Sequence, residues 1–503
     1  MKKYLYLLLL PLILSCSDQK DIEISIPSTP DELKLHTAEF QKEVIEVTDG
    51  VHMAVGFALA NSMMIEGDGS NIIIDTTGSI ETAREVKEIF QSINPNPISA
   101  IIYTHNHADH IYGASVFAEG SNPDIYAHSS TEKYISRVIG VLRPIISSRS
   151  AKMFGNVLPR EEIENNGIGP FLEIGRDGRT TGLLYPTKVF DEKLELEISG
   201  VKVVLYHAPG ETNDQIFVWL PEKKALFPGD NFYKTFPNLY TIRGTPYRDL
   251  AGWVNSLDMM RYLEPDYLVP SHTRPIIGKE EIYKNLTIYR DGIQYIHDQT
   301  IRLMNLGMGP DEIAENIALP KHLGDSSFLK EFYGTAEWSA RNVFSGYLGW
   351  FDGNPSTLKP LPKLEEANNL VTLAGGWDSL FKVAEKSYKN QDYQWALQLT
   401  DYLLLTKPNN KEATILRMSS LTALGERESN PNSRYYYLSS ATLLDPDYKP
   451  NDILAPTLEV IRKYPIEAML ESLKVSVIPE KSIDKNIQLL FVFTDSGKKF
   501  SLF

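Results

Sequence analysis

Seven residues, Thr104-His-Asn-His-Ala-Asp-His110, contain four side chains of the types that bind transition metals: His105, His107, Asp109 and His110. They directly follow the apolar run 98–103, which is typical of a strand buried on both faces. Strand ends are where α/β folds place their chemistry. Alternate residues of an extended turn point the same way, so His105 and His107 can share one ion. Asp109 and His110 stand where a helix would begin and can turn toward a second ion nearby.

Three more candidate ligands follow later strands. Each of the strand-like runs 201–206, 225–227 and 267–270 has a candidate acidic or imidazole ligand within a few residues of its end. These side chains belong to Glu211, Asp230 and His272. Each alone could be an ordinary turn residue, but the whole series in order predicts one metal centre. Imidazoles dominate the set, which favours zinc, although iron and manganese also accept mixed nitrogen and oxygen ligands.

The pattern H-x-H-x-D-H after a buried strand resembles the metallo-β-lactamase superfamily. The resemblance implies an α/β fold, an αββα sandwich, with one or two zinc ions at its strand ends. It implies that Asp230 bridges the two ions. The position of Glu211 corresponds to the third ligand of the first ion, where the superfamily commonly has histidine. His272 corresponds to the last ligand of the second ion.

With a carboxylate at position 211, the chain resembles the type III alkylsulfatases within that superfamily. The likeness runs from about residue 40 to about residue 445 and includes the stretches 57–61 with Asn61, 149–155, 238–244, 331–334 and 347–355. It implies hydrolysis of primary alkyl sulfates such as dodecyl sulfate, with Asn238 and Arg243 binding the sulfate group. Two features depart from the family. Asp230 stands where the family usually has Glu, and the residues around 211 and after 272 differ from the sequences that the family usually has there.

The charge of the predicted centre supports an arginine for the substrate. Two Zn²⁺ ions would be balanced by the carboxylates of Asp109, Glu211 and Asp230 together with one bridging hydroxide. A neutral centre gains little by attracting an anion, so a sulfate ester needs its own cation. Arg243 carries a planar fork that matches a tetrahedral oxyanion, and Asn238 can donate beside it. The alternative for Arg243 is an ordinary arginine at a surface or sheet edge.

The predicted reaction is hydrolysis by metal-activated water, with Asp109, Asp230 and Arg243 as the catalytic residues. The resemblance implies attack at carbon with C–O cleavage, whereas the residues themselves leave attack at sulfur equally open. No Ser-His-Asp set or catalytic cysteine is evident in the sequence, which disfavours a protein nucleophile.

The N-terminus predicts export. Met1-Lys-Lys3 is basic, 5–14 is apolar, and Leu14-Ser-Cys16 ends the run as in a bacterial lipoprotein signal peptide, residues 1–16. The apolar run is shorter than the roughly 20 residues of a membrane span. We therefore expect an exported protein of the periplasm or outer membrane, lipid-anchored at Cys16, with residues 17–39 as a tether. An ordinary signal peptide or an uncleaved anchor is the alternative.

Composition fits an exported soluble enzyme. The 503 residues carry 42% hydrophobic side chains, enough for two or three domains, and a net charge of −15 without a basic stripe, which argues against nucleic acid. Residues 40–364 alternate strand-like and helix-like segments and form the predicted catalytic domain. Within them, 135–190 is expected to be an irregular insert that covers the mouth of the site.

The rest of the chain has a different pattern. Residues 365–448 show apolar side chains at helical spacing, in the style of a tetratricopeptide hairpin. The family resemblance implies that this domain makes a homodimer; peptide binding is the alternative. Residues 449–503 resemble the first half of a sterol-carrier-like domain, which makes the tail either truncated or reduced.

Other functions remain as alternatives to an alkylsulfatase. One is a hydrolase of the same fold that acts on a thioester, lactone or phosphodiester; a β-lactamase is favoured less. Glu211 with the pair Asn238 and Arg243 argues against these. Another is a lipid-handling lipoprotein without catalysis, against which the complete ligand set argues.

Overall fold

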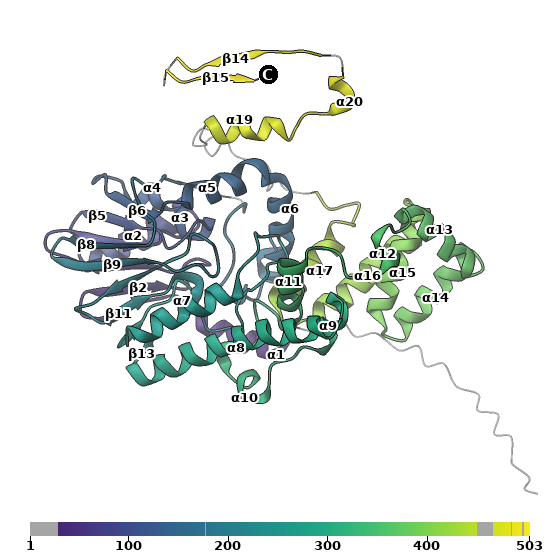
Figure 1. Cartoon of the computed structure of the whole chain (residues 1–503), viewed down its shortest axis with the longest axis horizontal. Helices are drawn as coiled ribbons and strands as arrows, with labels where there is room; N and C mark the ends of the chain where they lie inside the picture. The colour runs from purple at the N-terminus through teal and green to yellow at the C-terminus, as the bar shows by residue number, and fades with distance from the viewer. Residues whose placement is uncertain (1–28, 177, 450–465, 484, 495–496, 503) are drawn as a thin grey trace, which may run out of the picture.

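Two β-sheets form the core of the part of the molecule drawn on the left of Figure 1. The computed structural model describes residues 29–449 except 177, and 466–502 except 484, 495 and 496. The first sheet has its strands in chain order, antiparallel up to β4 and parallel from there on. Its strands are β1 (Glu43–Thr48), β2 (Val51–Val55), β3 (Ser62–Glu66), β4 (Asn71–Ile74), β5 (Ile98–Ile102), β6 (Asp124–His128) and β7 (Lys188–Phe190).

The second sheet has the order β13-β12-β11-β10-β9-β8, and within it only β11 and β12 run parallel. Its strands are β8 (Lys193–Ile198), β9 (Val201–His207), β10 (Ile216–Leu220), β11 (Ala225–Phe227), β12 (Tyr267–Leu268) and β13 (Ile276–Ile277). Side chains such as Met53 and Ile72 of the first sheet and Leu205 and Val218 of the second share one buried apolar cluster. The two sheets therefore pack face to face.

Helices cover both outer faces. The first sheet is covered by α2 (Ile80–Ile93) and α4 (Ala114–Phe117), whose apolar residues join those of the sheet in a second cluster. The second sheet is covered by α7 (Leu250–Tyr262), α8 (Lys279–Asn305) and α11 (Ala336–Leu348). This arrangement confirms the predicted αββα sandwich. Shorter helices are α3 (Ala108–Ile111), α5 (Thr131–Ser136), α9 (Pro310–Asn316), α10 (Lys321–Gly324) and α12 (Pro355–Leu358).

The expectation of an irregular insert at 135–190 is only half right. The π-helical turn Arg137–Val141 and the helix α6 (Arg143–Met153) occupy its first part, followed by a 3-10 turn at Arg160–Glu162. Pro144 lies in the first turn of α6, where its missing N–H costs nothing. Between 163 and 187 the described residues form no helix or strand.

The last part of the predicted tether is folded. The helix α1 (Asp31–His36) and the 3-10 turn Thr37–Phe40 fold onto the body of the protein. Leu33 is fully buried, and its carbonyl accepts a hydrogen bond from the Asn165 side chain. The segment is polar overall, so the few apolar side chains that dock it were not distinctive in the sequence. Cys16 and the rest of the predicted signal peptide lie outside the described residues.

The described residues from 363 to 442 are mainly helical, as the apolar spacing predicts: α13 (Lys363–Leu373), α14 (Trp377–Lys389), α15 (Tyr393–Thr406), α16 (Lys411–Arg427) and α17 (Pro431–Thr442). Neighbours from α14 to α17 pack on one another, and α17 also packs on α6. Asn430 anchors the start of α17 by donating hydrogen bonds to the carbonyls of Glu331 and Tyr333. The last helix is thereby joined to the sandwich.

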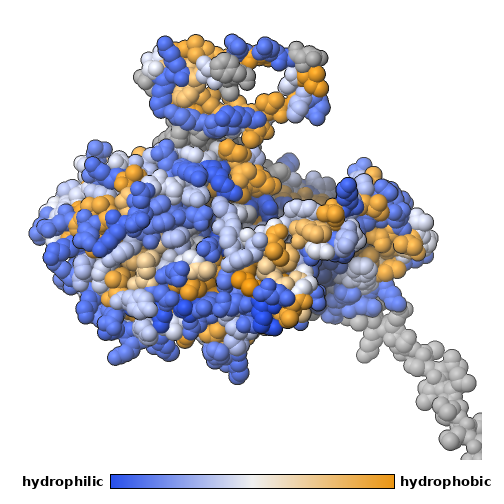
Figure 2. Space-filling model, viewed as in Figure 1, coloured by the Kyte–Doolittle hydropathy of each residue, from blue (hydrophilic) through white to orange (hydrophobic). Residues whose placement is uncertain are grey.

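The described part of the tail comprises α19 (Ile466–Lys474), α20 (Pro479–Ser482) and a hairpin of β14 (Leu489–Val492) and β15 (Lys499–Leu502). It lies above the sandwich in Figure 1, and α19 contacts the π-helical turn. Leu489 and Leu490 are at least half exposed, and hydrophobic surface is visible on this tail in Figure 2. The sterol-carrier resemblance stays a prediction. In the described part of the chain, no helix combines the length and the apolar character that crossing a membrane requires.

Candidate active site

The structure brings six of the seven predicted metal ligands together. They form two groups, each with its nitrogen or oxygen ligand atoms within 4.8 Å of one another. The first group is His105, His107 and Asp230, and the second is Asp109, His110 and His272. All come from the same edge of the sandwich, as predicted: the β5–α3 loop and α3, the 3-10 turn Gly229–Asn231 after β11, and the loop after β12. Two adjacent groups of three ligands suit a pair of metal ions.

Asp230 lies between the two groups. Its Oδ2 is 3.6 Å from Nε2 of His105 and 3.1 Å from Nε2 of His272. Its Oδ1 is 3.5 Å from Nε2 of His110. One carboxylate thus faces histidines of both groups, which is the geometry of a bridging ligand, and the shorter side chain of aspartate suffices to reach them.

Hydrogen bonds fix which nitrogen each imidazole presents. Nδ1 of His110 lies 2.8 Å from Oδ2 of Asp75, and Nδ1 of His272 lies 2.8 Å from the carbonyl oxygen of Leu59. Because both acceptors take the Nδ1 proton, Nε2 of each ring is left with its lone pair toward the carboxylates. Asn61 supports the same arrangement by donating to the carbonyl of Thr273, which secures the loop that carries His272.

Burial and charge set the protonation of the histidines. Burial lowers the pKa of His105 to about 3 and holds the pKa of His107 well below its usual range. Burial acts in the same sense on His110 and His272, but the carboxylates of Asp230 and Asp109 together outweigh it and raise the pKa of both. Metal binding at the second group therefore competes with protons for His110 and His272.

Glu211 is the predicted ligand that the structure places apart from these groups. It is buried in the loop after β9, and its Oε2 lies 2.5 Å from Nη1 of Arg248, which is also fully buried. Its backbone N–H donates to the side-chain oxygen of Asn231. The predicted charge balance changes accordingly: Arg248 offsets Glu211, so a centre with two divalent ions would keep a positive excess.

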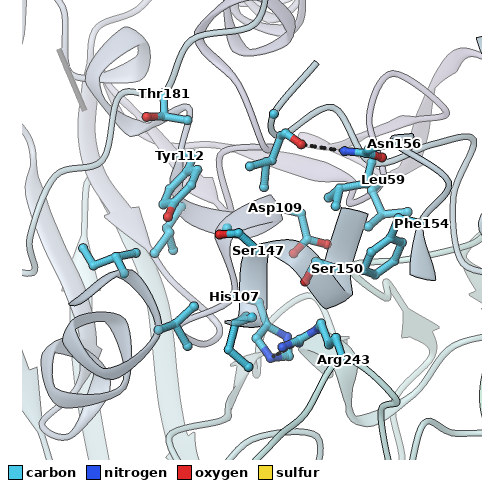
Figure 3. A pocket seen from close by; sticks show the side chains of 18 of the residues that line it. Leu59, His107, Asp109, Tyr112, Ser147, Ser150, Phe154, Asn156, Thr181 and Arg243 are labelled. Carbon is cyan, nitrogen blue, oxygen red and sulfur yellow. Dashed lines mark hydrogen bonds between the residues drawn. The ribbon is translucent and has the colours of Figure 1, made fainter. Parts of the chain in front are cut away.

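Of the two residues predicted to bind sulfate, Arg243 lies beside a metal-binding group, whereas Asn238 lies next to Arg248, whose Nη1 donates to its carbonyl. Nη2 of Arg243 is 3.0 Å from Nε2 of His107, and Figure 3 shows the guanidinium pointing at this imidazole. Asn238 is fully buried, and neither its amide nitrogen nor its side-chain oxygen has a hydrogen-bond partner among the described residues. An arginine beside one metal-binding group, and an amide with free donor and acceptor capacity, fit the role of anion ligands.

A cavity of about 220 Å³ opens onto the two groups (Figure 3). His107, Asp109, Asp230 and Arg243 line its polar end. Its walls are mainly apolar. One wall is formed by a single face of α6 together with Phe154, the residue that follows this helix. The lining residues of this wall include Ile146, Ser147, Ser150, Ala151 and Phe154, and others of the cavity are Leu59, Ile111, Ile135, Ile139, Ile168, Leu172, Ile174 and Tyr333. The insert does cover the site, as predicted from its length.

Sequence reasoning missed two buried groups next to the ligands. Arg248 is one, and the signal that could have found it is Glu211 itself, because a buried carboxylate needs a cation. Asp214 is the other: it accepts hydrogen bonds from the side chains of Asn106 and Thr131, with donor–acceptor distances of 2.5 and 2.8 Å. Asn106 stands between His105 and His107, so Asp214 fixes the loop that carries them.

Comparisons with known proteins agree with this architecture. Residues 55–272 match a family model for the metallo-beta-lactamase superfamily, and residues 309–446 match one for alkyl sulfatase dimerisation. The second match begins ahead of the predicted domain boundary at 365, so that boundary stays a prediction.

Relatives and solved structures point the same way. The chain is 36% identical, over 87% of its length and 86% of the relative, to a linear primary-alkylsulfatase of a Pseudomonas species. It is 27% identical, over 91% of its length and 71% of the relative, to an (R)-specific secondary-alkylsulfatase of Pseudomonas. A stereoselective inverting secondary alkylsulfatase from Pseudomonas superposes with a TM-score of 0.84 at 26% identity, covering 92% of this chain and 74% of that one. The chain therefore belongs to the alkylsulfatases of the metallo-β-lactamase superfamily.

Proposed function

We propose that this protein hydrolyses alkyl sulfate esters, with linear primary alkyl sulfates such as dodecyl sulfate as substrates, and that it uses two zinc ions. One observation carries the proposal: two adjacent metal-binding groups, with Asp230 facing histidines of both, lie at the polar end of a cavity whose walls are mainly apolar. A primary alkyl sulfate has the same division, with an anionic head and an apolar chain. The similarity to a linear primary-alkylsulfatase supports this choice of substrate.

The residues present fit a pair of metal ions. Nε2 of His110 and Oδ1 of Asp230 are buried and have no hydrogen-bond partner among the described residues, which is costly unless a ligand binds them. His105, His107 and Asp230 would hold one ion, and Asp109, His110 and His272 the other. Divalent zinc at such a site supplies positive charge and lowers the pKa of water.

The protein's own groups have defined tasks in the reaction. Arg243 binds the sulfate oxygens, and Asn238 donates to the same group through its free amide. The apolar wall of α6 excludes water from the alkyl chain. Asp109 and Asp230 hold their carboxylates against the histidines of the centre, and in the proposed reaction water attacks the carbon and releases alcohol and sulfate.

The first experiment measures sulfate release from dodecyl sulfate by the purified protein, loaded with zinc or treated with chelator. We expect release only with zinc, and a loss of about 100-fold in kcat/KM for Arg243→Ala, since the lost group binds a developing charge. Arg274→Ala serves as control, because this arginine pairs with Glu43 on the surface. A folded, zinc-binding protein that releases no sulfate would contradict the proposal.

Substrate preference and bond cleavage need separate tests. Octan-1-yl and octan-2-yl sulfate, supplied at equal concentration, distinguish primary from secondary specificity; a preference for the second would contradict the primary assignment. Reaction in ¹⁸O-labelled water places the label in the alcohol if carbon is attacked, and in sulfate if sulfur is attacked. A thioester, a lactone and a phosphodiester test the alternative hydrolases.

We further propose that the protein is an exported lipoprotein anchored at Cys16, and a homodimer. The first proposal rests on the basic and apolar N-terminal sequence. The second is supported by the match of residues 309–446 to the dimerisation family model. Labelling with a fatty acid, lost in Cys16→Ser, tests the anchor. Sedimentation equilibrium tests the dimer.

A further inference from the structure

A second, small cavity lies beside the main one. Its lining includes three guanidinium groups, from Arg137, Arg243 and Arg248, together with Tyr134 and Tyr247. We call this cavity the side pocket. Most of its rim, including Arg137, is half exposed, so it opens to solvent.

Donors in the side pocket lack acceptors. Nε and Nη2 of Arg248 and the hydroxyl of Tyr247 are buried and have no hydrogen-bond partner among the described residues. Arg137 has no ion pair in the same part of the chain. Buried donors without acceptors are costly, and a group of them selects an acceptor-rich ligand.

Charge selects the same kind of ligand. Three guanidinium groups face one carboxylate, that of Glu211, whose Oε2 already pairs with Arg248. The side pocket therefore keeps an excess of positive charge, and guanidinium forks match tetrahedral oxyanions. Its free space is about 20 Å³, so such an anion would be held at the mouth, between Arg137 at the rim and Arg248 beneath.

The side pocket adjoins the reaction site. Asn106, His107, Val138 and Arg243 line both cavities, so they form the partition between the two. The walls of the main cavity are mainly apolar, whereas three guanidinium groups line the side pocket. Two products of opposite character therefore have two different surfaces to occupy.

We propose that the side pocket is a second oxyanion site, through which the sulfate product leaves. The assignment rests on the proposed function, in which an alkyl sulfate and water give an alcohol, a sulfate dianion and one proton that passes to solvent. The C–O bond of the ester breaks, and a new C–O bond forms with the water oxygen. Arg243 faces both cavities and passes sulfate to Arg248 and Arg137, while the alcohol stays in the apolar cavity.

The test is calorimetric titration of inorganic sulfate into the full-length zinc-loaded protein at constant ionic strength, without turnover. We expect Arg137→Gln to weaken sulfate binding about tenfold, because charge-assisted hydrogen bonds are lost. Lys133→Gln is the matched control: it removes the same charge one helical turn away, from an exposed side chain outside the side pocket. Equal weakening in both variants, or none in either, would overturn the site.

A second variant and a second ligand sharpen the result. Tyr247→Phe removes only an unpaired hydroxyl, so it should fold normally and still weaken sulfate binding by a few-fold. Decanol should bind in the apolar cavity, so we expect Arg137→Gln to bind decanol as tightly as the unaltered protein does. If this variant lost affinity for decanol as well as for sulfate, the site would be overturned. If sulfate binding depends on Arg137 but the protein does not hydrolyse alkyl sulfates, the exit role and the proposed function are overturned and the oxyanion site is kept. If the protein hydrolyses alkyl sulfates, but Arg137→Gln and Tyr247→Phe bind sulfate like the unaltered protein, only the assignment of the side pocket is overturned.

Discussion

The carboxylate of Asp75 accepts the Nδ1 proton of His110 at 2.8 Å, and it also accepts from the backbone and hydroxyl of Thr104 and from the hydroxyl of Ser271. Asp75 directly follows β4, is fully buried and has a φ of +54°. One side chain thus ties the loops after β4, β5 and β12 together and sets the ring orientation of a metal-binding histidine. The residue is a positioning group for the centre.

Replacing Asp75 by Asn should therefore weaken zinc binding by about 10- to 100-fold, because an amide nitrogen would face donors and His110 would lose its orientation. Competition with a chromogenic chelator measures the affinity. Asp124→Asn, on the exposed start of β6, is the control and should leave it unchanged. Equal zinc affinity in Asp75→Asn and the control would show that the hydrogen bond does not position the ligand.

Ile145 and Ile146 are neighbours on α6 with different surroundings. Ile146 lines the main cavity, whereas Ile145 is 53% exposed and does not. Ile146→Asp should raise KM for dodecyl sulfate by more than about tenfold, because a carboxylate would meet the alkyl chain and the anionic head. Ile145→Asp should change KM by less than about twofold. Similar KM values for both variants would exclude the α6 wall as the site of the alkyl chain.

Tyr435 connects α17 to the insert. Its fully buried hydroxyl accepts a hydrogen bond from the backbone N–H of Glu164 and donates one to the carbonyl of Asn165, both at 2.9 Å. Tyr435→Phe should lower the free energy of unfolding by about 1–3 kcal/mol, since it leaves both backbone groups unpaired. Denaturant unfolding measures this change. Tyr436→Phe is the control, because that hydroxyl has no hydrogen bond among the described residues; the idea fails if the two variants unfold alike.

His36 should make stability depend on pH. It stacks on Phe332 with ring centroids 4.2 Å apart, and its Nε2 lies 2.7 Å from the carbonyl oxygen of Gly167. Burial lowers the pKa of His36 below the ordinary value of 6.5. The unfolded chain therefore binds the proton first as the pH falls, and the stability that His36 contributes is full above pH 6.5 and declines below it.

The corresponding experiment follows the free energy of unfolding between pH 8 and pH 5 in the zinc-loaded protein. His36→Gln should show a shallower decline over this range than the unaltered protein. His322→Gln removes an exposed histidine from α10 and should follow the unaltered protein. An identical slope in all three proteins would mean that His36 titrates alike in the folded and unfolded chain.

The sandwich and the ligand positions were predictable because they follow from local sequence. Runs such as 72–74 and 100–102 are apolar and are typical of buried strands, and each ligand stands a few residues beyond such a run. The contacts of Glu211 were not predictable in this way. Arg248 lies 37 positions away, and its approach to Glu211 depends on how the loop before α7 folds.

The insert and the N-terminal segment escaped prediction for a related reason. Their structure depends on partners distant in the sequence rather than on their own periodicity. α6 has no marked apolar stripe because it buries one face toward the cavity and another toward α17. Likewise, α1 is held by the Asn165 side chain and by the stacking of His36 on Phe332, contacts that no local pattern announces.

The position of α6 between the cavity and α17 has a consequence for dividing the protein into parts. The hydroxyl of Ser439 on α17 donates to the carbonyl of Lys152 on α6, and Tyr436 packs in the same apolar cluster as Met153 and Phe154. A fragment that ended at residue 364 would keep every metal-binding side chain but would expose the back of the cavity wall. Neither part is a self-sufficient module, because the cavity wall belongs to the sandwich while its support comes from the helical region.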